Sequence, residues 1–174
     1  MFADLVAPTD APIVERMRSA GGIPIGRTNL PELGLRVSTD NPLHGLTRNP
    51  WHPGLCAGGS SGGSGVALAT GMVWLATGND LGGSLRVPAS FNGVVGLRPS
   101  PGRVPRSSRL PAFDTLWVEG PMGRSVADVA LMLDAGAGQM LNDPLSFNTS
   151  IESYVDHLKN SHLPKRAAFS TDLN

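Results

Sequence analysis

The chain has 174 residues, of which 14 are Lys or Arg and 14 are Asp or Glu, so its formal net charge is zero. Only 16% of the residues are charged and 40% are hydrophobic, which is the reverse of the balance that keeps a chain disordered. Neutral charge without a basic cluster argues against a dedicated nucleic-acid-binding protein. Together, 22 glycines and 15 prolines make up roughly a fifth of the chain, nearly double the usual ~12%.

Cysteine usage and hydropathy exclude several further classes. A single cysteine, Cys56, rules out an intramolecular disulfide and favours a reducing compartment, so we expect a cytoplasmic protein. The N-terminus carries Asp4 and no basic residue, which is not the pattern of a signal peptide. Within the longest uncharged stretch only residues 66–76 are apolar, too few for the about 20 residues of a membrane-spanning helix. His44 and His52 lack further ligands nearby, so we expect no metal and no cofactor.

Hydrophobic periodicity predicts alternating helices and short strands, which is typical of an α/β fold. The first helix is expected over residues 11–20, with Asp10 as its N-cap, and a short buried strand over residues 23–25. Residues 28–57 are expected to form a long ordered loop. Ser125 is the expected N-cap of a later helix. The remaining expected elements are helices over 65–71, 84–91, 124–133 and 150–158, strands over 72–77, 94–97 and from 166 to 170, a tight turn over 78–83, and a proline-rich loop over 99–121.

The most unusual segment is the glycine-serine run GGSSGGS at residues 58–64. Such runs are commonly flexible linkers, but this one leads directly into an apolar helix and strand. A phosphate-binding loop would end in Gly-Lys-Ser/Thr, and the first lysine of the chain is Lys159. A nucleophile elbow is matched formally by G-x-S-x-G, but an elbow follows a core strand, and the proline-containing residues 49–54 cannot form one.

A second glycine turn suggests a fourth interpretation. Ser84 follows Gly82 and Gly83, whose main-chain amides are unobstructed by side chains. Successive amides beside a hydroxyl are what an oxyanion hole next to a serine nucleophile requires, and a helix beginning at Ser84 would add positive potential. The helix and strand between the two turns could bring the hydroxyls of Ser60 and Ser84 together.

The segment GGSSGGS at 58–64, followed by DLGGSLRVP at 80–88, closely resembles the amidase signature family. The flanking residues 10–34, 47–50, 93–99 and 120–122 fit the same family, so the resemblance covers about residues 8–140. It implies the α/β amidase-signature fold, a mixed sheet flanked by helices, which this chain contains only in part. Residues 1–174 are therefore interpreted as a partial amidase domain, with a family-like core at 8–140 and a more polar C-terminal segment at 141–174.

The resemblance implies amide hydrolysis by a Ser–Ser–Lys triad. By motif position Ser84 matches the nucleophile, and Ser60 matches the bridging serine, whose peptide bond with Gly59 is expected to be cis. Ser60 would pass the proton of Ser84 to the base and later return one to the leaving amine. The amides that match the oxyanion hole are those of Leu81, Gly82, Gly83 and Ser84.

Neighbouring residues are expected to play supporting roles. Ser61 and Ser64 are interpreted as structural hydroxyls that cap the turn or the next helix. Asp80 and Arg86 are interpreted as a salt bridge that shapes the loop, and Cys56 as a buried bystander.

The sequence departs from the family pattern at the lysine that serves as the catalytic base. The family's catalytic lysine precedes the bridging serine by several dozen residues, but both lysines here, Lys159 and Lys165, lie in the last 16 residues. Arg27 cannot replace it, because a guanidinium stays protonated. The chain therefore resembles the central portion of an amidase, without the lysine segment and the C-terminal half, and alone is expected to show little or no turnover.

Three alternatives stay open. Within the family, the chain is also similar to the glutamyl-tRNA amidotransferase component that acts on misacylated tRNA, although Asn92 stands where that subgroup is expected to have Cys. The family's cyclic-oligoamide hydrolases resemble the same stretch, and a non-catalytic truncated remnant is the alternative from a different class. The expected partners are a small-molecule amide and, for an intact protein, a second copy as a homodimer, with no nucleic acid and no membrane span.

Overall fold

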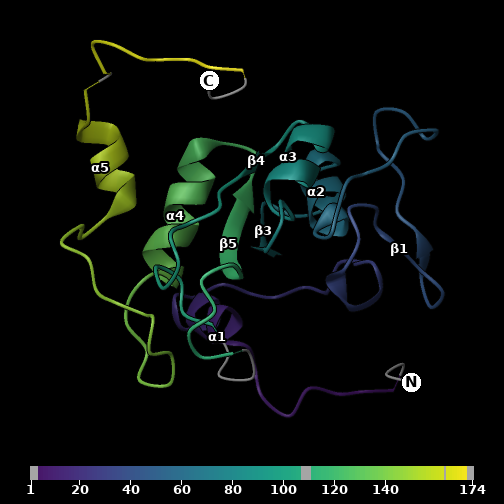
Figure 1. The fold of residues 1–174 in the computed structure, drawn as a ribbon, viewed down its shortest axis with the longest axis horizontal. Coiled ribbons are helices and arrows are strands. Elements are labelled where there is room, and N and C mark those ends of the chain that lie inside the picture. The colour runs from purple at the N-terminus through teal and green to yellow at the C-terminus, as the bar shows by residue number, and fades with distance from the viewer. Residues whose placement is uncertain (1–3, 107–110, 163, 172–174) are drawn as a thin grey trace.

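The computed structural model describes residues 4–106, 111–162 and 164–171, and its helices and strands alternate as the periodicity predicted (Figure 1). The elements are α1 (Pro12–Ser19), η1 (Glu32–Gly34), β1 (Asp40–Asn41), β2 (Gly45–Leu46), α2 (Gly62–Ala69), β3 (Leu75–Asp80), α3 (Arg86–Asn92), β4 (Val95–Gly96), β5 (Val118–Gly123), α4 (Val126–Gly136) and α5 (Tyr154–Asn160).

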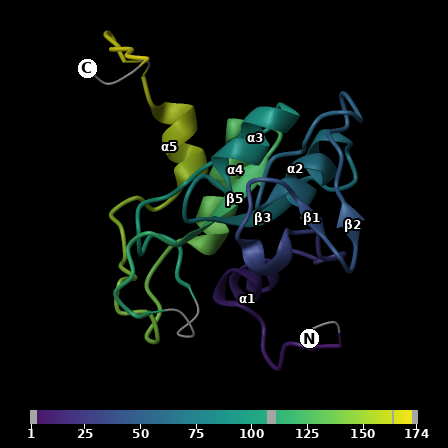
Figure 2. The same ribbon diagram turned by 45° about the vertical axis from the view of Figure 1, so that its right-hand side comes forward.

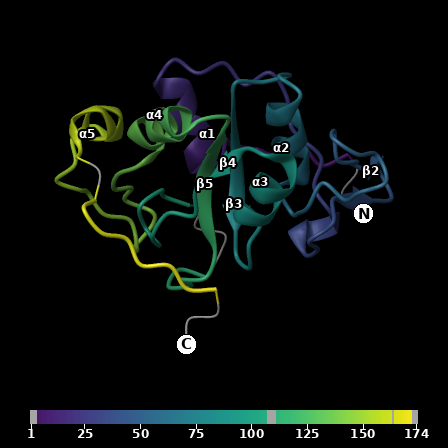
Figure 3. The ribbon, with the colours of Figure 1, turned by 90° about the horizontal axis from the view of Figure 1, so that it is seen from above.

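A three-stranded sheet in the order β3-β5-β4 forms the centre, and both of its pairings are antiparallel. Viewed from above, the strands lie between α2 and α3 on one side and α4 with α1 on the other (Figure 3). A small hairpin of β1 and β2 lies at the periphery, beyond α2 (Figure 2). The chain is thus an α/β protein with a layered core, as expected.

The buried apolar side chains form two clusters. Leu68 of α2, Leu85 and Ala89 around α3, and Met122 of β5 form the first cluster. The second joins α1 to α4 and contains Ile13, Val104 and Leu133, with Val14, Met17 and Tyr154 packed against it. The first cluster is the one that matters for the site, because it fixes α2 and α3 against the sheet.

Gly78 of β3 allows α2 to lie close to the sheet. A Cβ at this position would be 2.6 Å from Ser61 Oγ and 2.8 Å from Leu85 Cδ2, so no larger residue fits without displacement. The strand over 75–80 therefore extends into residues that we expected to form a tight turn. The Gly-Asn-Asp sequence at 78–80 has low strand propensity, and packing against α2 and β5 overrides that propensity.

Helix ends agree with the sequence where side-chain caps are strong. Ser125 caps α4, as predicted, and the structure adds a reciprocal capping box with Asp128. The predicted cap of α1 is wrong: Ala11 is the N-cap residue and makes no side-chain bond, while Asp10 pairs with Arg18 at 2.8 Å. Pro12 at the helix start needs no capping partner, because it has no N–H.

Two predicted strands are also wrong. Residues 23–25 belong to no strand, and Ile23 and Ile25 are 86% and 74% exposed. Residues 166–170 are exposed and pair with no described strand. The proline-rich loop over 99–121 ends earlier than expected, because β5 begins at Val118. In each case the local sequence left open whether a partner strand was present, and the partner decides the outcome.

Other elements differ mainly in their bounds. The helix expected over 65–71 begins earlier, at Gly62, and the strand expected over 72–77 begins later, at Leu75. The long loop over 28–57 contains η1 and the small hairpin. Among the residues that the structure describes, no helix is long and apolar enough to cross a bilayer.

Candidate active site

The two glycine-rich turns meet at the start of α2 and α3. The first turn, residues 58–61, precedes α2, and the second, residues 81–85, connects β3 to α3. The amide nitrogen of Ser61 donates to the carbonyl oxygen of Ser84 at 3.3 Å, and Asn79 N donates to Ser61 Oγ at 3.4 Å. The fold therefore brings together the two serine-bearing segments that the sequence singled out.

Ser60 lies in the first turn, and its peptide bond with Gly59 is cis, as the resemblance implied. The side chain is 1% exposed, and its Oγ has no hydrogen-bond partner among the described residues. A Cβ placed on Gly34 of η1 would lie 3.7 Å from this oxygen. Buried hydroxyls are almost always hydrogen-bonded, so an unpaired one requires an explanation.

Thr39 holds the first turn in place, a role that the sequence did not reveal. It is fully buried, its Oγ1 donates to the carbonyl oxygen of Gly58 at 2.9 Å, and it accepts from the amide of Gly62 at 3.1 Å. A Cβ on Gly62 would lie 2.2 Å from this oxygen, which explains the glycine. A lone threonine in a loop gives no sequence signal for such a contact.

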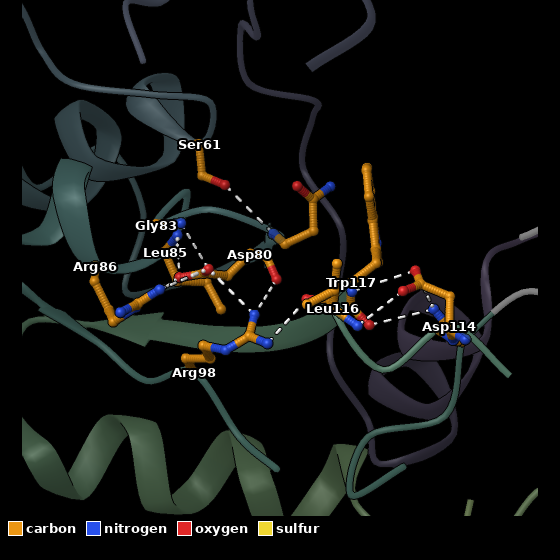
Figure 4. Close-up of polar contacts among 11 residues, drawn as sticks. Ser61, Asp80, Gly83, Leu85, Arg86, Arg98, Asp114, Leu116 and Trp117 are labelled. Carbon is orange, nitrogen blue, oxygen red and sulfur yellow. Dashed lines mark hydrogen bonds and ion pairs between the residues drawn. The ribbon is translucent and has the colours of Figure 1, made fainter. Parts of the chain in front are cut away.

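The second turn is organised around the buried carboxylate of Asp80 (Figure 4). This carboxylate accepts from the amides of Gly83 (2.8 Å) and Leu85 (3.2 Å), from Arg86 Nε and Nη2 (both 3.0 Å) and from Arg98 Nη1 (3.2 Å). Burial alone would raise the pKa of Asp80, but the hydrogen bonds from Arg86, Gly83 and Leu85 outweigh it and lower the pKa below its ordinary value. The expected ion pair with Arg86 is present, and Arg98 is a second partner that we did not predict.

The main-chain amides of the second turn differ in whether they have a hydrogen-bond acceptor. Gly83 N donates to Asp80 Oδ1 at 2.8 Å, so this amide already has an acceptor in the structure. The amides of Leu81, Gly82 and Ser84 have no acceptor within the described chain. Leu81 and Gly82 are exposed residues and Ser84 is half-buried.

The two neighbouring serines are structural, but they do not cap as expected. Ser61 is the N-cap residue of α2, yet its side chain makes no capping bond and instead accepts from Asn79 of β3. Ser64 lies inside α2; its Oγ donates to Thr77 O at 3.0 Å and is 2.9 Å from Thr28 Oγ1. Both hydroxyls therefore tie α2 to the sheet rather than to its own first turn.

Cys56 contacts the first turn, whereas the other residues singled out in the sequence lie outside both turns. Cys56 is half-buried rather than buried, and its Sγ accepts from Gly58 N at 3.1 Å. Asn92 is fully buried at the end of α3, where its Nδ2 donates to Ala57 O (2.8 Å) and Pro88 O (2.7 Å). His44 and His52 belong to no group of three or more metal-binding side chains in the described part of the chain.

Comparison with known proteins identifies the class to which this fold and these turns belong. The amidase family model matches residues 1–174, and the chain belongs to the amidase family. The resemblance noted in the sequence is therefore confirmed.

Individual amidase-family proteins are similar to the chain in sequence. The chain is 46% identical to an acylamidase of Rhodococcus erythropolis over 172 residues, covering 99% of the chain and 36% of the relative. It is 48% identical to an indoleacetamide hydrolase of Bradyrhizobium japonicum over 147 residues, covering 81% of the chain and 32% of the relative. A glutamyl-tRNA(Gln) amidotransferase component of Burkholderia pseudomallei is 44% identical over 158 residues, which cover 91% of the chain and 32% of the relative.

A solved structure is similar to the chain in fold as well as in sequence. The structure of 6-aminohexanoate cyclic dimer hydrolase complexed with substrate superposes with a TM-score of 0.86 at 40% identity, covering 91% of the chain and 34% of that protein. The chain thus spans about a third of the length of the relatives named here.

Proposed function

We propose that this chain carries the two serines of an enzyme that hydrolyses a carboxylic amide, with Ser84 as the nucleophile and Ser60 as the bridging serine. The observation that carries the proposal is the buried, unpaired Oγ of Ser60, in a turn hydrogen-bonded to the Ser84 main chain. A hydroxyl that relays protons needs a proton acceptor and a donor that change during the reaction, and permanent structural partners would hinder it.

In the proposed reaction the two serines act in sequence. Ser84 Oγ attacks the amide carbonyl carbon while its proton passes to Ser60 Oγ, whose own proton passes to the base. The negative charge on the former carbonyl oxygen is stabilised by the unengaged amides of Leu81, Gly82 and Ser84. The C–N bond then breaks, Ser60 returns a proton to the leaving amine, and water hydrolyses the acyl-enzyme to acid and free Ser84.

The described residues do not provide the base. Lys159 pairs with Asp156 on α5, which packs against α4, and Lys165 is exposed near the C-terminus. We propose that a lysine from polypeptide beyond the described residues approaches Ser60 Oγ, where this hydroxyl lacks a partner. Without that lysine the chain should show little or no turnover.

Substitution of the serines tests the proposal in an amide-hydrolysing protein that comprises this chain. Ser84→Ala and Ser60→Ala should each lower kcat by about 10³-fold or more, because triad members act as a unit. Ser90→Ala is the matched control, since Ser90 is exposed on α3 and makes no hydrogen bond that would hold the turn. Unchanged hydrolysis by Ser84→Ala would overturn the proposal.

A second function is favoured by the 44% identity to an amidotransferase component. In that case the two serines would release ammonia from an amide donor, and hydrolysis would depend on partner proteins and tRNA. Hydrolysis of simple amides by the purified protein without partners supports the amidase. Activity that appears only with glutamine, partners and tRNA supports the amidotransferase.

A further inference from the structure

Arg98 contacts the second turn in a way that Arg86 does not. Its Nη1 donates to both the main-chain carbonyl oxygen and the carboxylate Oδ1 of Asp80, and its Nη2 donates to Leu116 O at 2.9 Å (Figure 4). Arg86 contacts the carboxylate alone, and its side chain is 56% exposed against 23% for Arg98. Arg98 therefore holds the main chain of the turn as well as the carboxylate.

The carbonyl that Arg98 holds belongs to the same peptide unit as the N–H of Leu81. Because a trans peptide is planar, fixing the Asp80 carbonyl oxygen on one side fixes the direction of the Leu81 N–H on the opposite side. A cation at the carbonyl oxygen also polarises the unit, which makes its N–H a stronger donor. This N–H has no acceptor in the described chain, so it is free to serve a ligand.

The second guanidinium nitrogen of Arg98, Nη2, contacts Leu116 O, which lies in a loop held by further side-chain hydrogen bonds. Leu116 N donates to Asp114 Oδ1 at 2.8 Å, and the other oxygen of Asp114 accepts from Arg106 Nη1 at 3.2 Å. Arg106 is 6% exposed and also donates to Pro111 O at 3.0 Å. The loop that leads into β5 is thus tied to buried groups, and Arg98 connects it to the turn that carries Ser84.

We propose that Arg98 is a positioning residue of the oxyanion hole. It presets the Asp80–Leu81 peptide so that the Leu81 N–H points to the oxygen that becomes negative, and it couples this peptide to residues 114–117. The inference rests on the proposed function, because it requires a reaction in which Ser84 attacks a carbonyl group.

Variants of Arg98 in the amide-hydrolysing protein test the inference. Arg98→Met should lower kcat by about 10- to 100-fold, somewhat less than loss of a whole oxyanion-hole donor, with KM changed less than about twofold. The rate of covalent labelling by a fluorophosphonate should fall in parallel. Arg98→Lys should restore most of kcat, because an ammonium group can donate to both Asp80 oxygens. Arg86→Met should lower kcat less than Arg98→Met does.

Controls separate positioning from folding and from the proposed function. All rates are measured below the melting temperature of each variant, and Arg18→Met, which removes an exposed ion pair with Asp10, reports the effect of losing a surface arginine. If Arg98→Met does not fold, Arg98→Gln replaces it and should show the same fall in kcat. A normal kcat in the folded Met or Gln variant, or a Lys variant no better than Met, would overturn the inference. Activity that survives Ser84→Ala would instead overturn the proposed function.

Discussion

The amide nitrogen of Ser61 donates to the carbonyl oxygen of Ser84 across 3.3 Å, so the two glycine-rich turns are joined through their main chains. Alanine at position 60 or 84 leaves this bond intact, because neither side chain takes part in it. Loss of activity in either variant can therefore be attributed to chemistry, provided that the melting temperature is unchanged.

The close contact at Gly78 gives a first prediction. Gly78→Ala should lower the free energy of unfolding by about 1–3 kcal/mol, because the added Cβ would overlap Ser61 Oγ and Leu85 Cδ2. Gly26→Ala is the control: a Cβ there has no atom within 4 Å, so the free energy should change by less than about 0.5 kcal/mol. Urea unfolding of both variants measures the difference. Equal effects of the two substitutions would contradict the packing described here.

The carboxylate of Asp80 predicts a pH dependence of stability. Its pKa is lowered in the folded state from the ordinary 3.8, so the stabilisation is complete above that value and is lost as the pH falls through the folded pKa. Asp80→Asn should cost about 3 kcal/mol near neutral pH, because it removes one partner of a buried ion pair. The difference between wild type and variant should shrink below about pH 4.

Unfolding free energies across an acid titration measure this difference, with the exposed Asp4→Asn as the control. A penalty for Asp80→Asn that stays constant, or grows, as the solution becomes more acidic would show that the carboxylate is not held in its charged form by its arginine and amide partners.

The capping box of α4 predicts a smaller effect. Ser125→Ala should destabilise the protein by about 1 kcal/mol, because the amide of Asp128 loses the hydroxyl that it donates to. Ser150→Ala, at an exposed position before α5, should change stability by less than about 0.5 kcal/mol. Thermal unfolding followed by circular dichroism compares the two, and a Ser125→Ala variant as stable as wild type would exclude a stabilising cap.

Local signals predicted much of this fold. Helical spacing and a strong cap located α4, and the glycine-serine run located the start of α2 to within a few residues. The C-terminal half of β3 could not be located, because Gly78, Asn79 and Asp80 favour a turn and become a strand only by pairing with β5 and packing under α2. The strand predicted over 23–25 is wrong for the opposite reason. The apolar pattern of these residues indicated a buried strand, but no described strand pairs with them.

In the candidate site, too, some residues could be predicted from the sequence and others could not. Its serines and Asp80 lie in short motifs with characteristic spacing, so the sequence could single them out. Thr39 and Arg98 lie 21 residues before Ser60 and 18 residues after Asp80 and act through main-chain oxygens, which leave no pattern in the sequence. The engagement of the Gly83 amide was equally hidden, because it depends on which direction the Asp80 side chain takes.

The most direct measurement is the position of covalent modification by a fluorophosphonate in an amide-hydrolysing protein that comprises this chain. Mass spectrometry of the digested protein should find the phosphonyl group on Ser84, and Ser84→Ala should abolish labelling. Ser60→Ala should slow the labelling, because the hydroxyl that accepts the proton of Ser84 is lost. Modification of Ser60, Ser61 or Cys56 instead, or labelling that persists in Ser84→Ala, would contradict the assignment of Ser84 as the nucleophile.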